Sequence, residues 1–429
     1  MDVVNRISPG RASAILLFLV AALYWPVVLN DWTNWDDPGY VLENDIVQNF
    51  PSADAIGILS PANPVLGNYH PVTIFSLGLD HWLWGNSAAG FHLTNLLLHL
   101  LNVWLVFIFI FRWSGQTIPA LVAAIAFGIH PLHVEAVAWI PGRKDLLMTT
   151  FYLLGLISWL QYLRPSKAGK KYFALALLFF LLSLLSKAVA VTFPLALFLI
   201  DMLAERKISA KIIIEKIPFV WISLIIGVIA VLAQSDAQSI QGGETDDGPG
   251  NITAAAYGIF TYLVDFIIPH HLSAFHPYPS ADFGALTILH LGSVILILGL
   301  ALISLTKSRP LSIGIAFFLI TLLPVSQLIR VGDAILAERY TYLPYVGIVI
   351  ILSSGVSTWQ KRHFASTTGK ILAATFAIWL VFAGWMTIVR TGTWKNSEAL
   401  WTDVMQKYPK AHIAWINRSA YYLEEGKPE

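Results

Sequence analysis

The sequence predicts an all-α, polytopic membrane protein, and three observations indicate that fold class. Hydrophobic residues make up 56% of the 429-residue chain and charged residues only 12%, whereas a soluble domain carries about twice that charged share. The mean hydropathy is +0.65. Apolar runs long enough to cross a bilayer recur along the chain. Together these features exclude a soluble globular protein, a disordered tail and a coiled coil.

The charge balance and the cysteine count exclude further classes. There are 27 basic and 26 acidic residues, a net charge of +1, so we expect no nucleic-acid partner bound through bulk positive charge. The sequence has no cysteine, which excludes disulfides, thiolate zinc sites and cysteine nucleophiles.

Apolar runs predict about eleven membrane spans, because each crossing takes about 20 helical residues. The stretch 254–269 carries Asp265 and stops at Pro269, so we interpret it as a re-entrant or interfacial helix. The first run is followed by Trp25-Pro26 without a small-residue cleavage pattern, which favours a retained span over a signal peptide. The predicted spans are 12–30, 91–111, 117–130, 145–163, 172–187, 188–204, 217–233, 285–305, 310–329, 341–358 and 371–389.

The distribution of Lys and Arg predicts the orientation. With a cytoplasmic N-terminus, sixteen basic residues fall in cytoplasmic loops and five in the opposite loops, leaving six after the last predicted span, from Arg390 onward. We therefore expect a multi-pass protein of a bacterial inner membrane or an equivalent bilayer, with an extracytoplasmic tail. The five outward bases are Arg143, Lys144, Lys187, Arg330 and Arg339.

Acidic residues fill two of the predicted outer loops. The first, 31–90, has seven acids and no Lys or Arg; the second, 234–253, has Asp236, Glu244, Asp246 and Asp247. Two adjacent carboxylates, Asp36 and Asp37, stand at the start of the first loop, where one of them could act as a general base. The structural alternative is an Asx-type turn before Pro38, capped by Asp36.

The outward bases suggest an anion site beside these carboxylates. Snorkelling to lipid headgroups explains each base singly, but together they indicate a phosphate bound near a carboxylate. His130 and His133 could seed a divalent-cation site with Glu135 or a loop aspartate, although His-Pro is also an ordinary span end. A metal is not required, because side-chain cations can do the same work. His270, His271, His276 and Tyr278 are weaker candidates to line the site.

A composition change after Arg390 divides a transmembrane domain, 1–390, from a helical tail, 391–429. The segment 397–409 predicts one amphipathic helix. Trp415, Tyr422 and Gly426 then follow the spacing of the first helix of a tetratricopeptide repeat; an unrelated amphipathic tail is the alternative. One and a half repeats cannot bury a solenoid core, so we expect either that the array continues or that the tail packs on the membrane domain.

Six motifs in order resemble the transmembrane and tetratricopeptide-repeat (TMTC) proteins, which belong to the GT-C glycosyltransferase superfamily. The resemblance covers about residues 12–429, although the long repeat array of that family is represented only by a short segment. The motifs are Asn34-Trp35-Asp36-Asp37 with Asn44-Asp45, Asn68-Tyr69-His70-Pro71, Gly90-Phe91-His92-Leu93-Thr94-Asn95, His130-Pro131-Leu132-His133-Val134-Glu135 with Gly142-Arg143-Lys144-Asp145, Ser186-Lys187, and Glu338-Arg339-Tyr340.

The resemblance implies a GT-C-type bundle and an inverting transfer of a sugar, mannose in eukaryotic members. The donor would be a polyprenyl-phosphate sugar and the acceptor a protein hydroxyl or a glycan. Asp36 and Asp37 are the implied catalytic positions. Arg143, Lys187 and Arg339 would bind the donor phosphate. The residues expected to shape the substrate site are His70, His133, Glu135, Asp145, Glu338 and Tyr340.

Two other functions remain open from the sequence. A transporter or flippase of a lipid-linked substrate would use broken spans and ionisable groups at mid-membrane depth; Asp201 near a span end and Asp265 are the candidates. A non-enzymatic scaffold would use the tail as a docking module, but it leaves the outer aspartates and bases unexplained.

Overall fold

The computed structural model describes residues 8–51, 57–165, 167–207, 209–236, 250–270, 272–279, 283–362 and 366–427. Glu244, Asp246 and Asp247 of the second acidic loop, and His271, lie outside the described residues.

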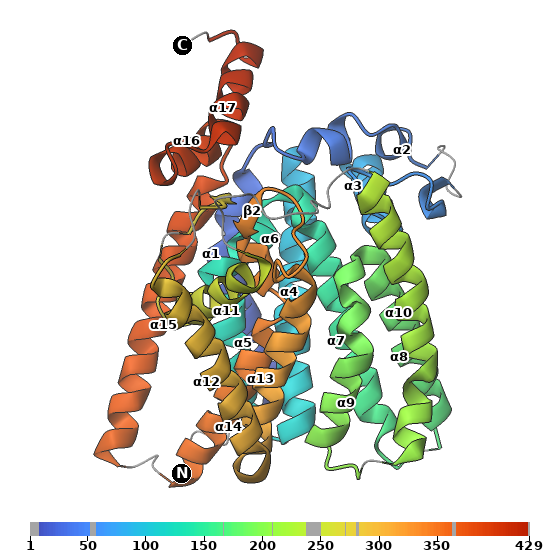
Figure 1. Ribbon diagram of the computed structural model, residues 1–429, viewed down its shortest axis with the longest axis vertical. Helices are drawn as coiled ribbons and strands as arrows, with labels where there is room; N and C mark the ends of the chain where they lie inside the picture. Colours follow the sequence, from blue (N-terminus) through green and yellow to red (C-terminus); the bar gives the residue numbers. More distant parts are fainter. Residues whose placement is uncertain are drawn as a thin grey trace.

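Long helices packed side by side form the body of the molecule (Figure 1). Most of them run between its two ends, as a bundle that crosses a bilayer requires, because a helix satisfies its own backbone hydrogen bonds. They are α1 (Pro9–Tyr24), α4 (Ala88–Ser114), α5 (Thr117–Gly128), α7 (Arg143–Tyr162), α8 (Gly169–Ser186), α9 (Phe193–Leu203), α10 (Ala210–Asp236), α11 (Asn251–Ile267), α12 (Leu286–Lys307), α13 (Arg309–Leu322), α14 (Tyr345–Arg362) and α15 (Thr367–Thr393).

Short elements and loops gather at one end of this bundle, and the two tail helices project beyond it (Figure 1). The elements at this end are α2 (Asp45–Gln48), α3 (Pro71–Trp84), α6 (Val134–Ala138) and the antiparallel pair β1 (His276–Pro277) and β2 (Ala334–Leu336). The tail helices are α16 (Ser397–Lys407) and α17 (His412–Glu424). The 3-10 segments Pro131–His133, Ala188–Thr192 and Glu338–Thr341 lie in the connections that precede α6, α9 and α14.

Helix length and composition confirm an integral, multi-pass membrane protein. Within the described residues, six helices are long and apolar enough to cross a membrane: Pro9–Leu29, Ala88–Ser114, Gly169–Ser186, Ala210–Ser235, Leu286–Lys307 and Thr367–Thr393. A bent pair would make a seventh, and three shorter apolar helices include Asn251–Ile267. On α12, Ile288 and Ile295 are at least 70% exposed, as expected of side chains that face lipid. The count of eleven spans and the re-entrant interpretation of 254–269 stay predictions.

A bend in the chain after α5 brings polar residues to the loop end. Thr117–Gly128 and Pro131–Ala138 meet at 56°. Pro131 has no N–H for continuing the helix, and the His130 side chain instead accepts a hydrogen bond from Leu132 N at 3.3 Å. The short helix α6 that follows carries Glu135, which is completely buried.

Close contact between α13 and α14 fixes the loop 323–344 that joins them. Their backbones meet at Gly314 and Gly347, because small residues let two helices approach closely. A Cβ added at Gly314 would lie 2.5 Å from the Gly347 carbonyl oxygen, and one added at Gly347 would lie 2.7 Å from Phe318 N. Neither neighbour is a flexible side chain, so the helices themselves would have to separate.

We expect Gly347→Ala to destabilise the protein by about 1–3 kcal/mol, the usual cost of overpacking. The control is Gly299→Ala on α12, where a Cβ meets nothing within 4 Å and alanine favours the helix. Thermal unfolding in detergent should show a lower midpoint for the first variant only. Equal midpoints would contradict a tight α13–α14 contact.

Candidate functional site

A cleft of about 410 Å³ opens at the loop end of the bundle. Loops and helix ends from distant parts of the chain form its walls, and charged, amide and aromatic side chains meet in it. The residues that line it are Trp35, Asp36, Leu66, Asn68, Trp139, Lys144, Lys187, Val189, Gln234, Ala274, Phe275, Pro324, Val325, Gln327, Ile329, Val331, Gly332, Asp333, Ala334, Arg339, Tyr340 and Ile413.

The two adjacent aspartates have different surroundings. Asp36 is half-buried and lines the cleft, and among the described residues its carboxylate has no hydrogen bond or ion pair. Asp37 is 1% exposed, and one of its oxygens accepts hydrogen bonds from Thr33 N (2.7 Å) and Thr33 Oγ1 (2.9 Å). Burial raises the pKa of Asp37 to about 7, although the bonds from Thr33 lower it. Asp37 therefore holds the turn, and Asp36 faces the cleft.

Three cations line the cleft. The Lys187 Nζ lies 2.6 Å from Asp145 Oδ1. The Arg339 guanidinium pairs with Glu135, whose second oxygen accepts from Arg339 N at 3.0 Å.

The third cation, Lys144, has no carboxylate partner among the described residues. Its Nζ donates to Tyr40 Oη at 3.1 Å and lies 4.8 Å from the Trp139 ring centroid. Lys144 stands next to Arg143 in the same sequence motif, but the residues predicted to bind the donor phosphate included Arg143 and not Lys144.

The structure places Arg143 outside the cleft. Its guanidinium is fully buried and donates to Asp80 Oδ2 (2.6 Å), Ser76 Oγ (2.9 Å) and the Phe91 carbonyl (2.9 Å), as well as to Asn95 Oδ1. These bonds join α3, α4 and α7. Arg143 thus ties the helices beneath the cleft together.

Most residues expected to shape the site form a layer behind the lining. Only Tyr340 lines the cleft itself; Glu135 and Asp145 are buried and pair with the cleft cations. His70 is buried and its ring stacks on Tyr40 at 5.2 Å. Burial, helped by Lys144 and Lys187, holds the pKa of His70 well below its usual value, so this imidazole is neutral.

Glu338 and His133 lie further from the lining. Glu338 is buried and accepts from Arg390 Nη2 (2.9 Å) and Nε (3.1 Å). His133 is buried, and its Nδ1 bonds the Phe127 carbonyl at 2.8 Å.

The structure gives no support to a cation site at His130 and His133. Both rings bond backbone carbonyls, and Glu135 is engaged by Arg339. In the described parts of the chain, no group of three His, Asp or Glu residues could hold a metal ion.

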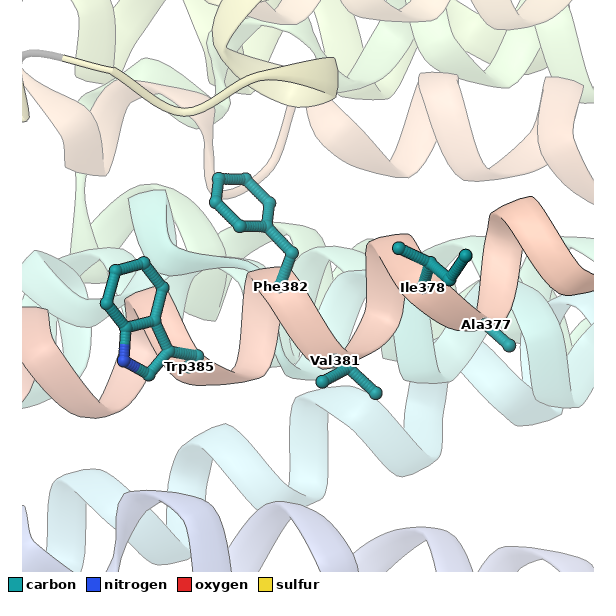
Figure 2. A pocket seen from close by; sticks show the side chains of 5 residues that line it. All are labelled: Ala377, Ile378, Val381, Phe382 and Trp385. Atoms are coloured by element: carbon teal, nitrogen blue, oxygen red, sulfur yellow. The ribbon is translucent and has the colours of Figure 1, made fainter.

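A second hollow, of about 490 Å³, lies on the surface of α15 (Figure 2). Its lining is Ala377, Ile378, Val381, Phe382 and Trp385, and the indole N–H is the only side-chain polar group in that set. Ile378 and Val381 are at least 70% exposed, as lipid-facing residues are. It has no group that could act as an acid, a base or an anion ligand.

Several lining residues were not anticipated from the sequence. Trp35 and Trp139 stack with centroids 5.2 Å apart. Trp35 belongs to the first motif, but Trp139 lies between the two parts of the fourth, and tryptophans near a membrane surface suggest an interfacial belt first. Gln327 has φ of 67° and its amide bonds the Ala334 carbonyl at 3.1 Å, so it closes the loop over the cleft. No pattern in the sequence marked Gln327 or Asp333.

Comparison with known proteins confirms the resemblance to the TMTC proteins. No family profile matches the sequence. The chain is 26% identical to the human protein O-mannosyl-transferase TMTC4, over 80% of this chain and 54% of that protein. It is 25% identical to the Caenorhabditis elegans protein O-mannosyl-transferase F38B6.6, over 94% of this chain and 59% of that protein. The chain thus spans little more than half the length of these curated relatives.

Solved structures show the fold. The oligosaccharyltransferase AglB from Archaeoglobus fulgidus, in complex with an inhibitory peptide and a dolichol-phosphate, aligns with a TM-score of 0.51. The alignment covers 96% of this chain and 59% of that one at 13% identity. The apo form of that enzyme gives the same TM-score. The chain therefore shares its fold with this oligosaccharyltransferase.

The position of Arg143 predicts a loss of stability on substitution. Arg143→Leu leaves Asp80 buried without its cation, which costs about 3–5 kcal/mol. The control is Arg309→Leu, since the Arg309–Glu205 pair is 54% and 75% exposed and should cost less than about 1 kcal/mol. Thermal unfolding in detergent distinguishes them. If Arg143→Leu unfolded like the parent protein, the buried pair would not hold the bundle.

Proposed function

We propose that this protein is a membrane glycosyltransferase that moves a sugar from a polyprenyl-phosphate donor to a hydroxyl of a protein or glycan. The observation that carries the proposal is one cleft that combines the unpaired Asp36 carboxylate with Lys144, Lys187 and Arg339. The similarity to protein O-mannosyl-transferases supports mannose as the sugar. The distribution of bases supports an extracytoplasmic cleft and tail.

In the proposed reaction, Asp36 is the general base. The acceptor hydroxyl oxygen attacks C1 of the sugar while its proton passes to the Asp36 carboxylate. The bond between C1 and the phosphate oxygen breaks, and the electron pair leaves with the polyprenyl phosphate. Because the acceptor attacks opposite to the departing phosphate, one displacement inverts the configuration at C1.

The three cations would stabilise the departing phosphate. Their charges are fixed in place before reaction, which is the arrangement that lowers the barrier when negative charge develops. Glu135 and Asp145 pair with Arg339 and Lys187, whereas no carboxylate among the described residues forms an ion pair with Lys144. This supports Lys144 as a phosphate ligand in place of the buried Arg143.

An apolar groove beside the cleft supports a lipid-linked donor. It measures about 260 Å³ and lies between α11, α12 and α13. The segment 323–331 lines both spaces. Leu323, Ser326 and Leu328 line the groove, and the residues that line the cleft are Pro324, Val325, Gln327, Ile329 and Val331. An isoprenoid chain in the groove would hold its phosphate at the cleft cations.

We expect Asp36→Asn to reduce transfer by at least 100-fold, the range lost with a general base. Asp37→Asn should retain at least a tenth of the activity, because Asn still accepts the bonds from Thr33. The measurement is the turnover of radiolabelled polyprenyl-phosphate mannose in nanodiscs. Transfer of mannose to a Ser/Thr-rich peptide and hydrolysis of the donor by water are both counted. Full activity of Asp36→Asn would exclude Asp36 as the general base. Loss of activity in Asp37→Asn alone would assign that role to Asp37.

Lys144→Gln should weaken binding of undecaprenyl phosphate about 10-fold or more, since a charge-assisted hydrogen bond contributes about 1.5–3 kcal/mol. Lys410→Gln is the control: this lysine is exposed on the tail and outside the cleft. A binding titration with the lipid in detergent gives both constants. Unchanged affinity in Lys144→Gln would place the phosphate elsewhere.

A further inference from the structure

We propose that the tail helices α16 and α17 complete the cleft. The tail holds Asp36 in position and limits access of the acceptor. The inference rests on the proposed function. It assigns a role to the tail that is separate from any docking of proteins along a repeat array. Three segments that line the cleft are each bound by the tail, and one tail residue lines the cleft itself.

The first segment is the loop that carries Asp36. Asn34, two residues before it, donates from its backbone N to Ser397 Oγ at 2.9 Å and from its amide to the Asn417 carbonyl at 2.7 Å. Its amide oxygen accepts from Trp401 Nε1 at 2.7 Å. One side chain and its backbone therefore contact both tail helices.

Aromatic packing reinforces this attachment. The Trp35 ring stacks on Trp139 with centroids 5.2 Å apart, and meets Trp401 at 5.5 Å and Trp394 at 6.3 Å. Trp394 and Trp401 are completely buried. Stacked and edge-to-face aromatic pairs are favourable beyond the area that they bury. The residue between Asn34 and Asp36 is thus locked between the tail and the membrane domain.

The second segment is 272–276, on another wall of the cleft. The Lys407 ammonium donates to the Leu272 carbonyl, and the Tyr408 hydroxyl lies 2.9 Å from His276 Nδ1. Ala274 and Phe275, which line the cleft, stand between these two attachments.

The third segment contains Arg339. Its neighbour Glu338 binds Arg390, and Arg390 Nη1 lies 3.1 Å from Asp403 Oδ2 on α16. The Glu338–Arg390 pair is buried and resists separation, because removal of either partner leaves a charge without compensation. The Arg390–Asp403 pair links it to the tail.

Ile413 is the tail residue that lines the cleft. It belongs to the first turn of α17. A passive spacer would need none of these bonds and would contribute no lining residue. The Trp401 N–H bonds Asn34 and none of the donor cations, so its loss should change the position of Asp36 without changing donor binding.

The first experiment compares Trp401→Phe with Trp415→Phe. Each removes one indole N–H and keeps an aromatic ring, but the Trp415 N–H bonds Pro409 O within the tail, whereas that of Trp401 holds Asn34. With polyprenyl-phosphate mannose in nanodiscs, we expect Trp401→Phe to lower kcat at least 10-fold with donor KM within twofold. Trp415→Phe should match the parent. Equal kcat in both variants, or a loss seen only as a higher donor KM, overturns the inference.

A readout without substrate separates this inference from the proposed function. The sequence contains no cysteine, so Asp36→Cys supplies a single thiol at the position of interest. Its modification rate by a methanethiosulfonate reagent should rise at least fivefold when Trp401→Phe is added, and stay unchanged with Trp415→Phe. Identical rates in all three proteins overturn positioning by the tail, whether or not Asp36→Asn abolishes transfer.

The acceptor side is tested at Ile413. Ile413→Trp narrows the cleft and should raise the KM for a Ser/Thr-rich peptide at least fivefold, while hydrolysis of the donor by water is retained. Ile416→Trp is the matched control, because Ile416 is 66% exposed on the same helix and does not line the cleft. An unchanged peptide KM in Ile413→Trp would exclude the tail from the acceptor path.

Discussion

The pairing of Glu135 with Arg339 is the interaction on which the cleft depends. One carboxylate binds both the guanidinium and the backbone N of Arg339, and so joins the bend after α5 to the loop before α14. A buried carboxylate in this place is tolerable only because it is paired. The same logic applies to Asp145 and Lys187. The buried carboxylates of Glu135 and Asp145 thus hold cations that line the cleft, whereas Asp36 forms no ion pair with any described residue.

This layering explains why charge neutrality hid the site. Each cleft cation except Lys144 brings a buried acid with it, so the region adds little to the net charge of the chain. What distinguishes the cleft is the arrangement: cations are oriented before a ligand arrives, and an unpaired carboxylate stands among aromatic rings. Orientation of fixed charges, rather than their number, is what lowers the barrier of a group-transfer reaction.

The sequence predicted the membrane bundle and the segments of the site, but not which residue of a pair faces inward. In both Asp36-Asp37 and Arg143-Lys144 the motif marks two neighbours, and the structure places only one of each in the cleft. Arg143 and Lys144 are successive residues of α7 and point about 100° apart, whereas Asp36 and Asp37 lie at the turn before Pro38–Leu42. In both pairs, packing against other elements decides which residue faces the cleft. Tertiary contacts such as Thr33 with Asp37, or Asp80 with Arg143, carry no local sequence signal.

Asn34 is bound to residues that follow it by 363 to 383 positions. At about 5–20 residues per second of synthesis, the first loop is made many seconds before the segment that completes it. During that interval Trp35 lacks its tail neighbours. The residues of the bundle that line the cleft are therefore made before the tail segment that binds the first loop, and the cleft is complete only when α16 and α17 have packed against the bundle. The order of synthesis therefore delays completion of the cleft until the tail has been made.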